Sequence, residues 1–180
     1  MVMGALTAQE REILEALDAA VFSPAVLEHI KGVVRRVNDR LTAGTNNMAW
    51  EPIPVERFGS ALPSMIRSGW IFILRAGVNT GAERHPNSHQ RMMSFAGTGS
   101  MDIRQSLQSE WTRNVLVSDV GEPFERRWIS IPPNVWHQPE TPPGPHWVVV
   151  SFHTVPPEEL IEERPHLEGA TGNRQMRYVT

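Results

Sequence analysis

Residues 77–97, GVNTGAERHPNSHQRMMSFAG, bring two histidines, a glutamate and a glutamine close together in the sequence. His85 and His89 lie four residues apart around a Pro-Asn-Ser turn, and Glu83 lies two residues before His85. Side chains of an extended strand alternate between its two faces, so residues 83 and 85 point to the same side. Neutral imidazoles this close favour a metal site. Its other ligands would be carboxylate or amide groups, because the chain has no cysteine.

The chain around this segment, from residue 50 onward, has the pattern of a β protein. Proline and glycine separate short runs rich in tryptophan, valine, isoleucine and phenylalanine. We expect strands over 70–76, 90–96, 100–105, 111–117, 127–131 and 146–154. No helical pattern separates them, which favours an antiparallel sandwich or barrel over a parallel α/β sheet. The segment 138–145, QPETPPGP, carries four prolines and is expected to be a stiff loop.

The first 44 residues have a helical pattern instead. Thr7 and Glu10 have the spacing of a capping box. Ser23 before Pro24 predicts the start of a second helix, and Gly44 its end. Apolar residues recur at helical spacing at Ile13, Leu14, Leu17, Val21, Leu27, Ile30, Val33, Val34, Val37 and Leu41. Such one-sided stripes must be buried, so we expect these helices to pack on the outside of the barrel or across a dimer interface.

Length and charge exclude several classes of function. At 180 residues the chain is most simply one domain with a sizeable core. A formal net charge of −3 provides no basic surface for nucleic acid or anionic membranes. We see no secretion signal in the first residues and no apolar stretch near the ~20 residues that span a bilayer, so we expect a cytoplasmic protein.

Two motifs in this order resemble those of the cupin superfamily, in which glycine, two histidines, glutamate and glycine recur at set intervals. Their counterparts in the first motif here are Gly77, Glu83, His85, Gln90 and Gly97. The second motif, PPNVWH at 132–137, resembles a proline, one residue, a glycine, two residues and a histidine. Asn134 stands at the glycine position, and asparagine tolerates positive φ better than most residues.

The resemblance covers roughly residues 60 to 155 and implies a fold and an assembly. Cupins form an antiparallel jelly-roll β-barrel, usually dimeric, with one metal at the barrel mouth. We therefore expect an all-β core over 51–156, preceded by a pair of α-helices within 1–50. A short helix and a polar tail are expected over 157–180, and a homodimer is the expected assembly.

The departures from the cupin pattern define the expected metal site. Glu83 takes the place of the first histidine, and Gln90 that of the glutamate, so the carried-over ligands are Glu83, His85, Gln90 and His137. Two histidines and one carboxylate, with positions left open, are associated with non-haem Fe(II) oxygen chemistry. In a second arrangement the PNSH turn bends inward and His89 replaces Gln90. Spacing does not decide between the two. Gln90 and His137 are expected to come from neighbouring strands.

Four further residues are expected to shape a substrate pocket. Met92 shares strand parity with Gln90, and His153 shares a face of its strand with Trp147, Val149 and Ser151. Trp136, next to His137, is placed to close the mouth of the barrel. Arg75 is placed to orient a substrate carboxylate through bidentate hydrogen bonds.

The resemblance implies an enzyme with one divalent metal, Fe(II) favoured and Mn, Ni or Zn as alternatives, acting on a small organic substrate. The expected activity is that of a mononuclear non-haem iron dioxygenase, with Glu83 as general base if it is not a ligand. Two alternatives stay open: metal-assisted isomerisation or lyase chemistry, and a non-catalytic small-molecule-binding cupin that acts as a sensor or a store. Metal content separates the binding module from the oxygenase.

Overall fold

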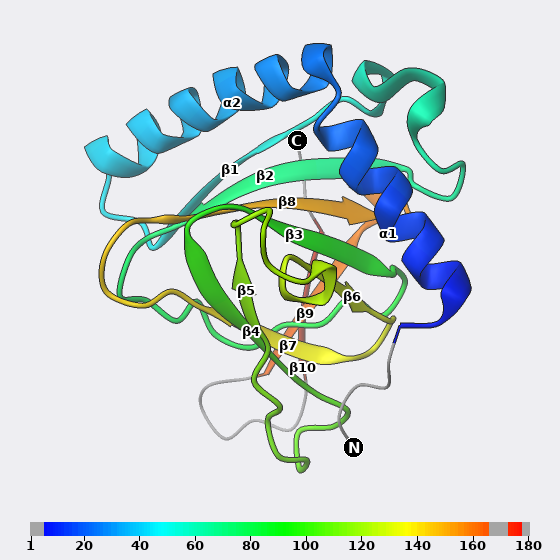
Figure 1. Ribbon diagram of the computed structural model, residues 1–180. Helices are drawn as coiled ribbons and strands as arrows, with labels where there is room; N and C mark the ends of the chain where they lie inside the picture. Colours follow the sequence, from blue (N-terminus) through cyan, green and yellow to red (C-terminus); the bar gives the residue numbers. More distant parts are fainter. Residues whose placement is uncertain (1–5, 166–172, 178–180) are drawn as a thin grey trace.

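The computed structural model describes residues 6–165 and 173–177, in which two helices precede a set of short strands (Figure 1). The helices are α1 (Ala8–Val21) and α2 (Pro24–Ala43), and the 3-10 turns are η1 (Val55–Ala61), η2 (Phe124–Arg126) and η3 (Pro157–Glu159). The strands are β1 (Met48–Pro52), β2 (Ser68–Leu74), β3 (Gln90–Ala96), β4 (Thr98–Arg104), β5 (Val115–Val117), β6 (Trp128–Ile131), β7 (Trp136–Glu140), β8 (Trp147–His153), β9 (Ile161–Pro165) and β10 (Asn173–Arg177).

The strands form three antiparallel sheets. The largest has the order β1-β2-β8-β3-β6, the second β5-β4-β7, and the third pairs β10 with β9. Isolated bridges Glu83↔His137 and Arg84↔Glu163 insert the segment before β3 between β7 and β9. The expected antiparallel β core with two N-terminal helices is confirmed.

Because side chains alternate along each strand, every second side chain points inward and fills the space between the two larger sheets. Trp147 and Val149 of β8 pack there with Met92 of β3 and with Met101 and Ile103 of β4. Gly99 makes room for the indole, since a Cβ at this position would lie 2.1 Å from Trp147 Cε3. The same parity turns Gln90, Ser151 and His153 toward the interior, where they are buried.

The helices cover the outer face of the five-stranded sheet, which confirms one of the two expected locations (Figure 1). Val150 and Phe152 of β8 share an apolar cluster with Leu17 of α1 and with Ile30 and Val37 of α2. Burying these two stripes against the sheet leaves the opposite helix faces to solvent, as their charged residues require.

The N-terminus of α1 differs from a full capping box. Thr7 Oγ1 accepts a hydrogen bond from the backbone N–H of Glu10 at 3.1 Å, as expected. The Glu10 carboxylate, however, accepts from Arg91 Nε at 2.7 Å and from Ser130 Oγ at 2.6 Å. A charge-assisted pair with a buried arginine is stronger than a local capping bond, so this carboxylate ties α1 to β3 and β6.

The turn expected in the second motif, with a positive φ at Asn134, is confirmed. Asn134 has φ 66°, and among the described residues it is the only non-glycine with a positive φ. Gly97, the last glycine of the first motif, has φ 82°, and a Cβ there would lie 2.8 Å from the carbonyl oxygen of His146.

Three expectations about elements were wrong in part. Residues 138–140 of the expected stiff loop belong to β7, where Pro139 is tolerated because β7 is the last strand of its sheet and has only isolated bridges on its other side. The region 111–117 is a strand only over Val115–Val117, with one further bridge at Thr112. The EELIEERP segment forms a three-residue 3-10 turn and then β9, in place of a short helix and polar tail. The rest of that expected tail lies partly outside the described residues.

Across the described ranges, no helix combines the length and the apolar composition needed to cross a membrane.

Candidate metal centre

Glu83, His85 and His137 form a cluster of potential metal ligands. One ligand atom from each lies within 4.8 Å of the others, and the two imidazole centroids are 5.3 Å apart. The backbones of Glu83 and His137 exchange two hydrogen bonds of 2.8 Å, which place these two residues opposite each other. The bridge between the pre-β3 segment and β7 therefore sets the carboxylate beside the imidazole.

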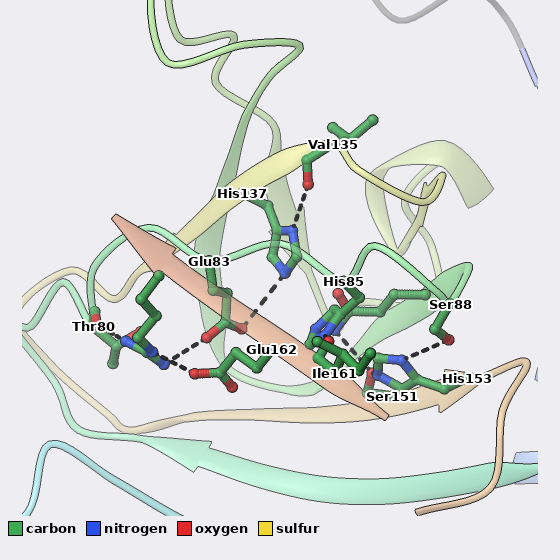
Figure 2. A network of polar contacts seen from close by, with 12 residues as sticks. Thr80, Glu83, His85, Ser88, Val135, His137, Ser151, His153, Ile161 and Glu162 are labelled. Atoms are coloured by element: carbon green, nitrogen blue, oxygen red, sulfur yellow. Dashed lines mark hydrogen bonds and ion pairs between the residues drawn. The ribbon is translucent and has the colours of Figure 1, made fainter. Parts of the chain in front are cut away.

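Both imidazoles are held through Nδ1 by backbone carbonyls (Figure 2). His85 Nδ1–H donates to Ile161 O at 3.0 Å, and His137 Nδ1–H donates to Val135 O at 3.1 Å. A carbonyl can only accept, so each ring carries its proton on Nδ1 and presents the lone pair of Nε2. This is the outer support that metal-binding histidines have.

His137 Nε2 is buried and has no hydrogen-bond partner. It faces Glu83 Oε1 at 3.5 Å, which is longer than an ordinary hydrogen bond (Figure 2). A buried, unsatisfied nitrogen that faces a carboxylate is what a bound cation would satisfy. The donor set of two imidazoles and one carboxylate fits a divalent first-row metal.

Glu83 is ionised in this environment. Burial alone would raise its pKa, but the adjacent His137, the His85 ring and the Arg164 guanidinium together hold the pKa well below its usual range. Arg164 Nη2 donates to Glu83 Oε2 at 2.6 Å, while Oε1 faces His137. One carboxylate oxygen is thus fixed from outside and the other is turned into the cluster.

The imidazoles of His85 and His153 are neutral at physiological pH. Burial and, to a smaller extent, the nearby His137 lower the pKa of His85 to about 4. Burial also holds the pKa of His153 well below its usual range, with the His85 ring as a second cause. Neutral imidazole is the form that binds metals.

Of the two arrangements left open by the sequence, the structure places Gln90 and not His89 on the interior side. His89 Nε2 lies 2.7 Å from Ser130 Oγ and 3.8 Å from the Glu10 carboxylate, under α1, so the expectation of His89 as a ligand is corrected. The PNSH turn does not bend inward. Gln90 and His137 also lie in different sheets, not on neighbouring strands as expected.

The four expected pocket residues divide evenly. Met92 and His153 line the pocket beside the cluster, and the His153 ring lies 4.8 Å from the His85 ring. Trp136 has the opposite parity to His137, so it is buried on the other face of β7, with its ring 4.7 Å from the Arg84 guanidinium. Arg75 donates to Leu41 O and Gly44 O at the C-terminus of α2, because unpaired helix carbonyls attract a cation there. Neither of these two side chains reaches the pocket.

The pocket next to the cluster has one polar end and apolar walls. The polar end comprises Thr80, Glu83, His85, Gln90 and His153. The walls comprise Met48, Phe72, Leu74, Met92, Met101, Pro139, Trp147, Val149 and Leu160. Apolar walls with a few polar groups at one end are typical of sites that orient a small organic molecule.

Sequence reasoning missed the contribution of β9. Ile161 O holds His85, and Arg164 joins Glu83 to Glu162 and to the backbone oxygen of Thr80. The charged run EERP gave no alternation from which a strand could be predicted. Two of its charged residues pair with the region of the site: Arg164 with Glu83, and Glu163 with Arg84.

No protein-family model and no curated protein matches the sequence, whereas solved structures do. CapF, a capsular polysaccharide assembling protein from Staphylococcus aureus, was solved with the inhibitor 3-isopropenyl-tropolone. That structure aligns at a TM-score of 0.51 and 13% identity, over 64% of this chain and 30% of that chain. The coconut allergen cocosin aligns at 0.50 and 14%, over 67% of this chain and 29% of that chain.

Oxalate oxidase in complex with the substrate analogue glycolate aligns at a TM-score of 0.48 and 16% identity, over 63% of this chain and 53% of that chain. At these identities the comparisons bear on the fold alone. This chain spans less than a third of CapF and of cocosin. The antiparallel core, the two sequence motifs and the likeness to these two proteins together identify the fold as that of the cupin superfamily.

Proposed function

We propose that the protein is a metal-dependent cupin enzyme that acts on a small organic substrate, most specifically a mononuclear non-haem iron dioxygenase. One observation carries the proposal. Glu83, His85 and His137 present one carboxylate and two imidazoles, with ligand atoms within 4.8 Å of one another. Two histidines and one carboxylate on a site with open positions are the ligand set of non-haem Fe(II) oxygenases.

A divalent ion bound here would supply Lewis acidity and a common template for oxygen and substrate. The residues of the chain do the rest. Val135 O and Ile161 O hold the two imidazoles in one tautomer, and Arg164 holds the outer oxygen of Glu83. The apolar walls exclude water from the substrate. If Glu83 does not ligate, its ionised carboxylate is placed to act as general base.

The test is elemental analysis of protein purified without chelator, for the parent and two histidine variants. We expect about one equivalent of metal in the parent, with iron favoured over manganese, nickel or zinc. His137→Ala should lose the metal and keep its fold, because the core does not depend on one ion. His89→Ala is the matched control and should keep the metal, since its ring lies under α1. Full metal content in His137→Ala would contradict the proposal.

The reaction class is tested by oxygen consumption with small organic substrates and iron-loaded protein. Substrate turnover without oxygen uptake would replace the dioxygenase with a metal-assisted isomerase or lyase. His137→Ala should abolish either activity.

A non-catalytic binding module is the second candidate, and one contact favours it. The ion pair between Arg164 Nη2 and Glu83 Oε2, at 2.6 Å, already compensates the Glu83 charge without a metal. A protein that remains metal-free after iron, manganese, nickel or zinc is offered, yet binds small molecules, would be this module.

A further inference from the structure

The pocket walls contain no group that could balance a charge. Among the described residues that line the pocket there is no lysine or arginine. The polar lining residues lie together at the cluster end, and the walls of β2, β4 and β8 present thioether, aromatic and aliphatic side chains. A charged group of a ligand that reached these walls would lose its water without gaining a partner, which disfavours its binding.

Gln90 supplies an unsatisfied hydrogen-bond acceptor at the polar end. Its Nε2 donates to Ser151 Oγ at 3.1 Å, and this bond fixes the amide plane. Its Oε1 is buried without any hydrogen-bond partner, in a residue that is 6% exposed and lines the pocket. A buried acceptor in this state is stabilised by a ligand that donates to it.

We infer that the pocket takes an uncharged, largely apolar molecule with a single hydroxyl group, whose O–H donates to Gln90 Oε1, and that it rejects molecules with a second, charged group. The inference rests on the proposed function, because it names the substrate class of the same site. A phenol or a simple apolar alcohol belongs to this class. An amino acid or a hydroxy acid with its carboxylate remote from the hydroxyl does not.

The first test compares two ligands of nearly equal shape, para-ethylphenol and para-hydroxyphenylacetate, by titration calorimetry on the full chain with its metal content measured. They differ only in a methyl or a carboxylate at the end remote from the hydroxyl. We expect para-ethylphenol to bind at least about fivefold more tightly, the minimum effect of one unsatisfied buried polar group. Equal affinities, tighter binding of the carboxylate, or no binding of para-ethylphenol would overturn the inference.

The second test isolates the acceptor. Gln90→Leu should weaken para-ethylphenol binding by about tenfold. It should leave the binding of para-ethylanisole, which has no O–H to donate, unchanged. The inference assigns Gln90 Oε1 to the substrate in place of the ligand role that the motif spacing predicts, so metal content should stay that of the parent. Equal losses for both ligands, or loss of the metal, would show that Gln90 is not the substrate acceptor.

The third test adds the missing cation. Met48 lies in the wall contributed by β1, and Met48→Arg should raise the affinity for para-hydroxyphenylacetate relative to the parent. Met65→Arg adds the same charge at an exposed residue outside the pocket lining and should change nothing. Equal behaviour of the two variants would contradict the inference. Metal content reports on the enzyme proposal separately: a metal-free protein with the predicted ligand preference would defeat that proposal alone.

Discussion

The two carboxylate oxygens of Glu83 face different residues, one in β9 and one in the candidate metal cluster. Oε2 accepts from Arg164, and Oε1 lies 3.5 Å from the unsatisfied Nε2 of His137. A carboxylate that is restrained through one oxygen presents the other in a single direction, which favours binding of the metal through one oxygen. At the scale of single residues, the hydrogen bond from Arg164 therefore determines which oxygen of Glu83 is left to bind a metal.

Glu83→Gln tests this residue directly. The amide is nearly the same shape but is a weak neutral ligand, and it cannot accept from Arg164 as strongly. We expect metal affinity to fall at least about tenfold in competition with a chelator, with little change in the thermal midpoint. Glu12→Gln, at an exposed position of α1, is the matched control and should bind metal like the parent. Unchanged affinity in Glu83→Gln would remove Glu83 from the ligand set.

Strand β9 orients the candidate metal ligands without contributing a ligand itself. It provides the carbonyl that orients His85 and the guanidinium that orients Glu83, and its Leu160 neighbour lines the pocket. β9 is joined to the rest of this region by the bridge between Arg84 and Glu163. At the scale of elements, ligands from the first motif depend on a strand that lies beyond both motifs.

Arg164→Met tests that dependence. The side chain keeps apolar bulk but no longer fixes Glu83, so metal affinity should fall by about 10–100-fold, the usual effect of losing an outer partner. Arg164→Lys should restore part of the affinity, because one ammonium bond to Glu83 remains possible. Equal metal binding in all three proteins would show that Arg164 has only a structural role.

The contact of α1 with the five-stranded sheet predicts a dependence of stability on pH. Burial would raise the pKa of Glu10, but hydrogen bonds from Arg91 and Ser130 and the charges of Arg91 and His89 lower it overall. A carboxyl with a lower pKa in the folded state stabilises the fold above its unfolded pKa and loses this effect as pH falls. Glu10→Gln should cost about 1 kcal/mol at pH 7, the upper range for a partly solvated pair. The difference from the parent should shrink as the pH falls below about 4.3, the unfolded-state value for glutamate.

Urea unfolding of the parent, Glu10→Gln and Glu12→Gln across this pH range measures the effect. Glu12 is exposed on the same helix and should show no such pH dependence. A constant difference between parent and Glu10→Gln at all pH values would refute the assignment.

Periodicity predicted the elements whose burial has a regular pattern. The stripes of α1 and α2 and the inward parity of Trp147, Val149 and His153 on β8 were visible because alternate residues meet different surroundings. β7 and β9 were not, because Pro139 interrupts one and paired charges fill the other. Among the site residues, the motif spacing predicted Glu83, His85 and His137 together. Arg164 was missed because it lies 81 residues from Glu83, and no local pattern links them.

At the scale of the whole molecule, the two N-terminal helices bury one face of the β core. Their buried residues share a cluster with Ile71 and Ile73 of β2 and with Val148, Val150 and Phe152 of β8. This is a continuous apolar face that the strands alone would leave exposed. The helical extension is thus part of the core, although the motifs lie wholly outside it.

Deleting residues 1–44 should therefore cause aggregation, measured by light scattering and size-exclusion chromatography beside the parent. A truncated chain that stays monodisperse with an unchanged β spectrum would count against this role. The homodimer implied by the cupin resemblance remains a prediction, and the same chromatography of the parent chain tests it.

The support of the site by β9 has a consequence for the order of events during synthesis. A ribosome that adds about 5–20 residues per second needs roughly 4 to 16 seconds to travel the 81 residues from Glu83 to Arg164. During this interval the nascent chain holds Glu83 and His85 without the groups that orient them. Metal capture by an oriented site must therefore follow translation of β9, so supply of the ion to the finished protein, rather than to the growing chain, governs how much of it becomes loaded.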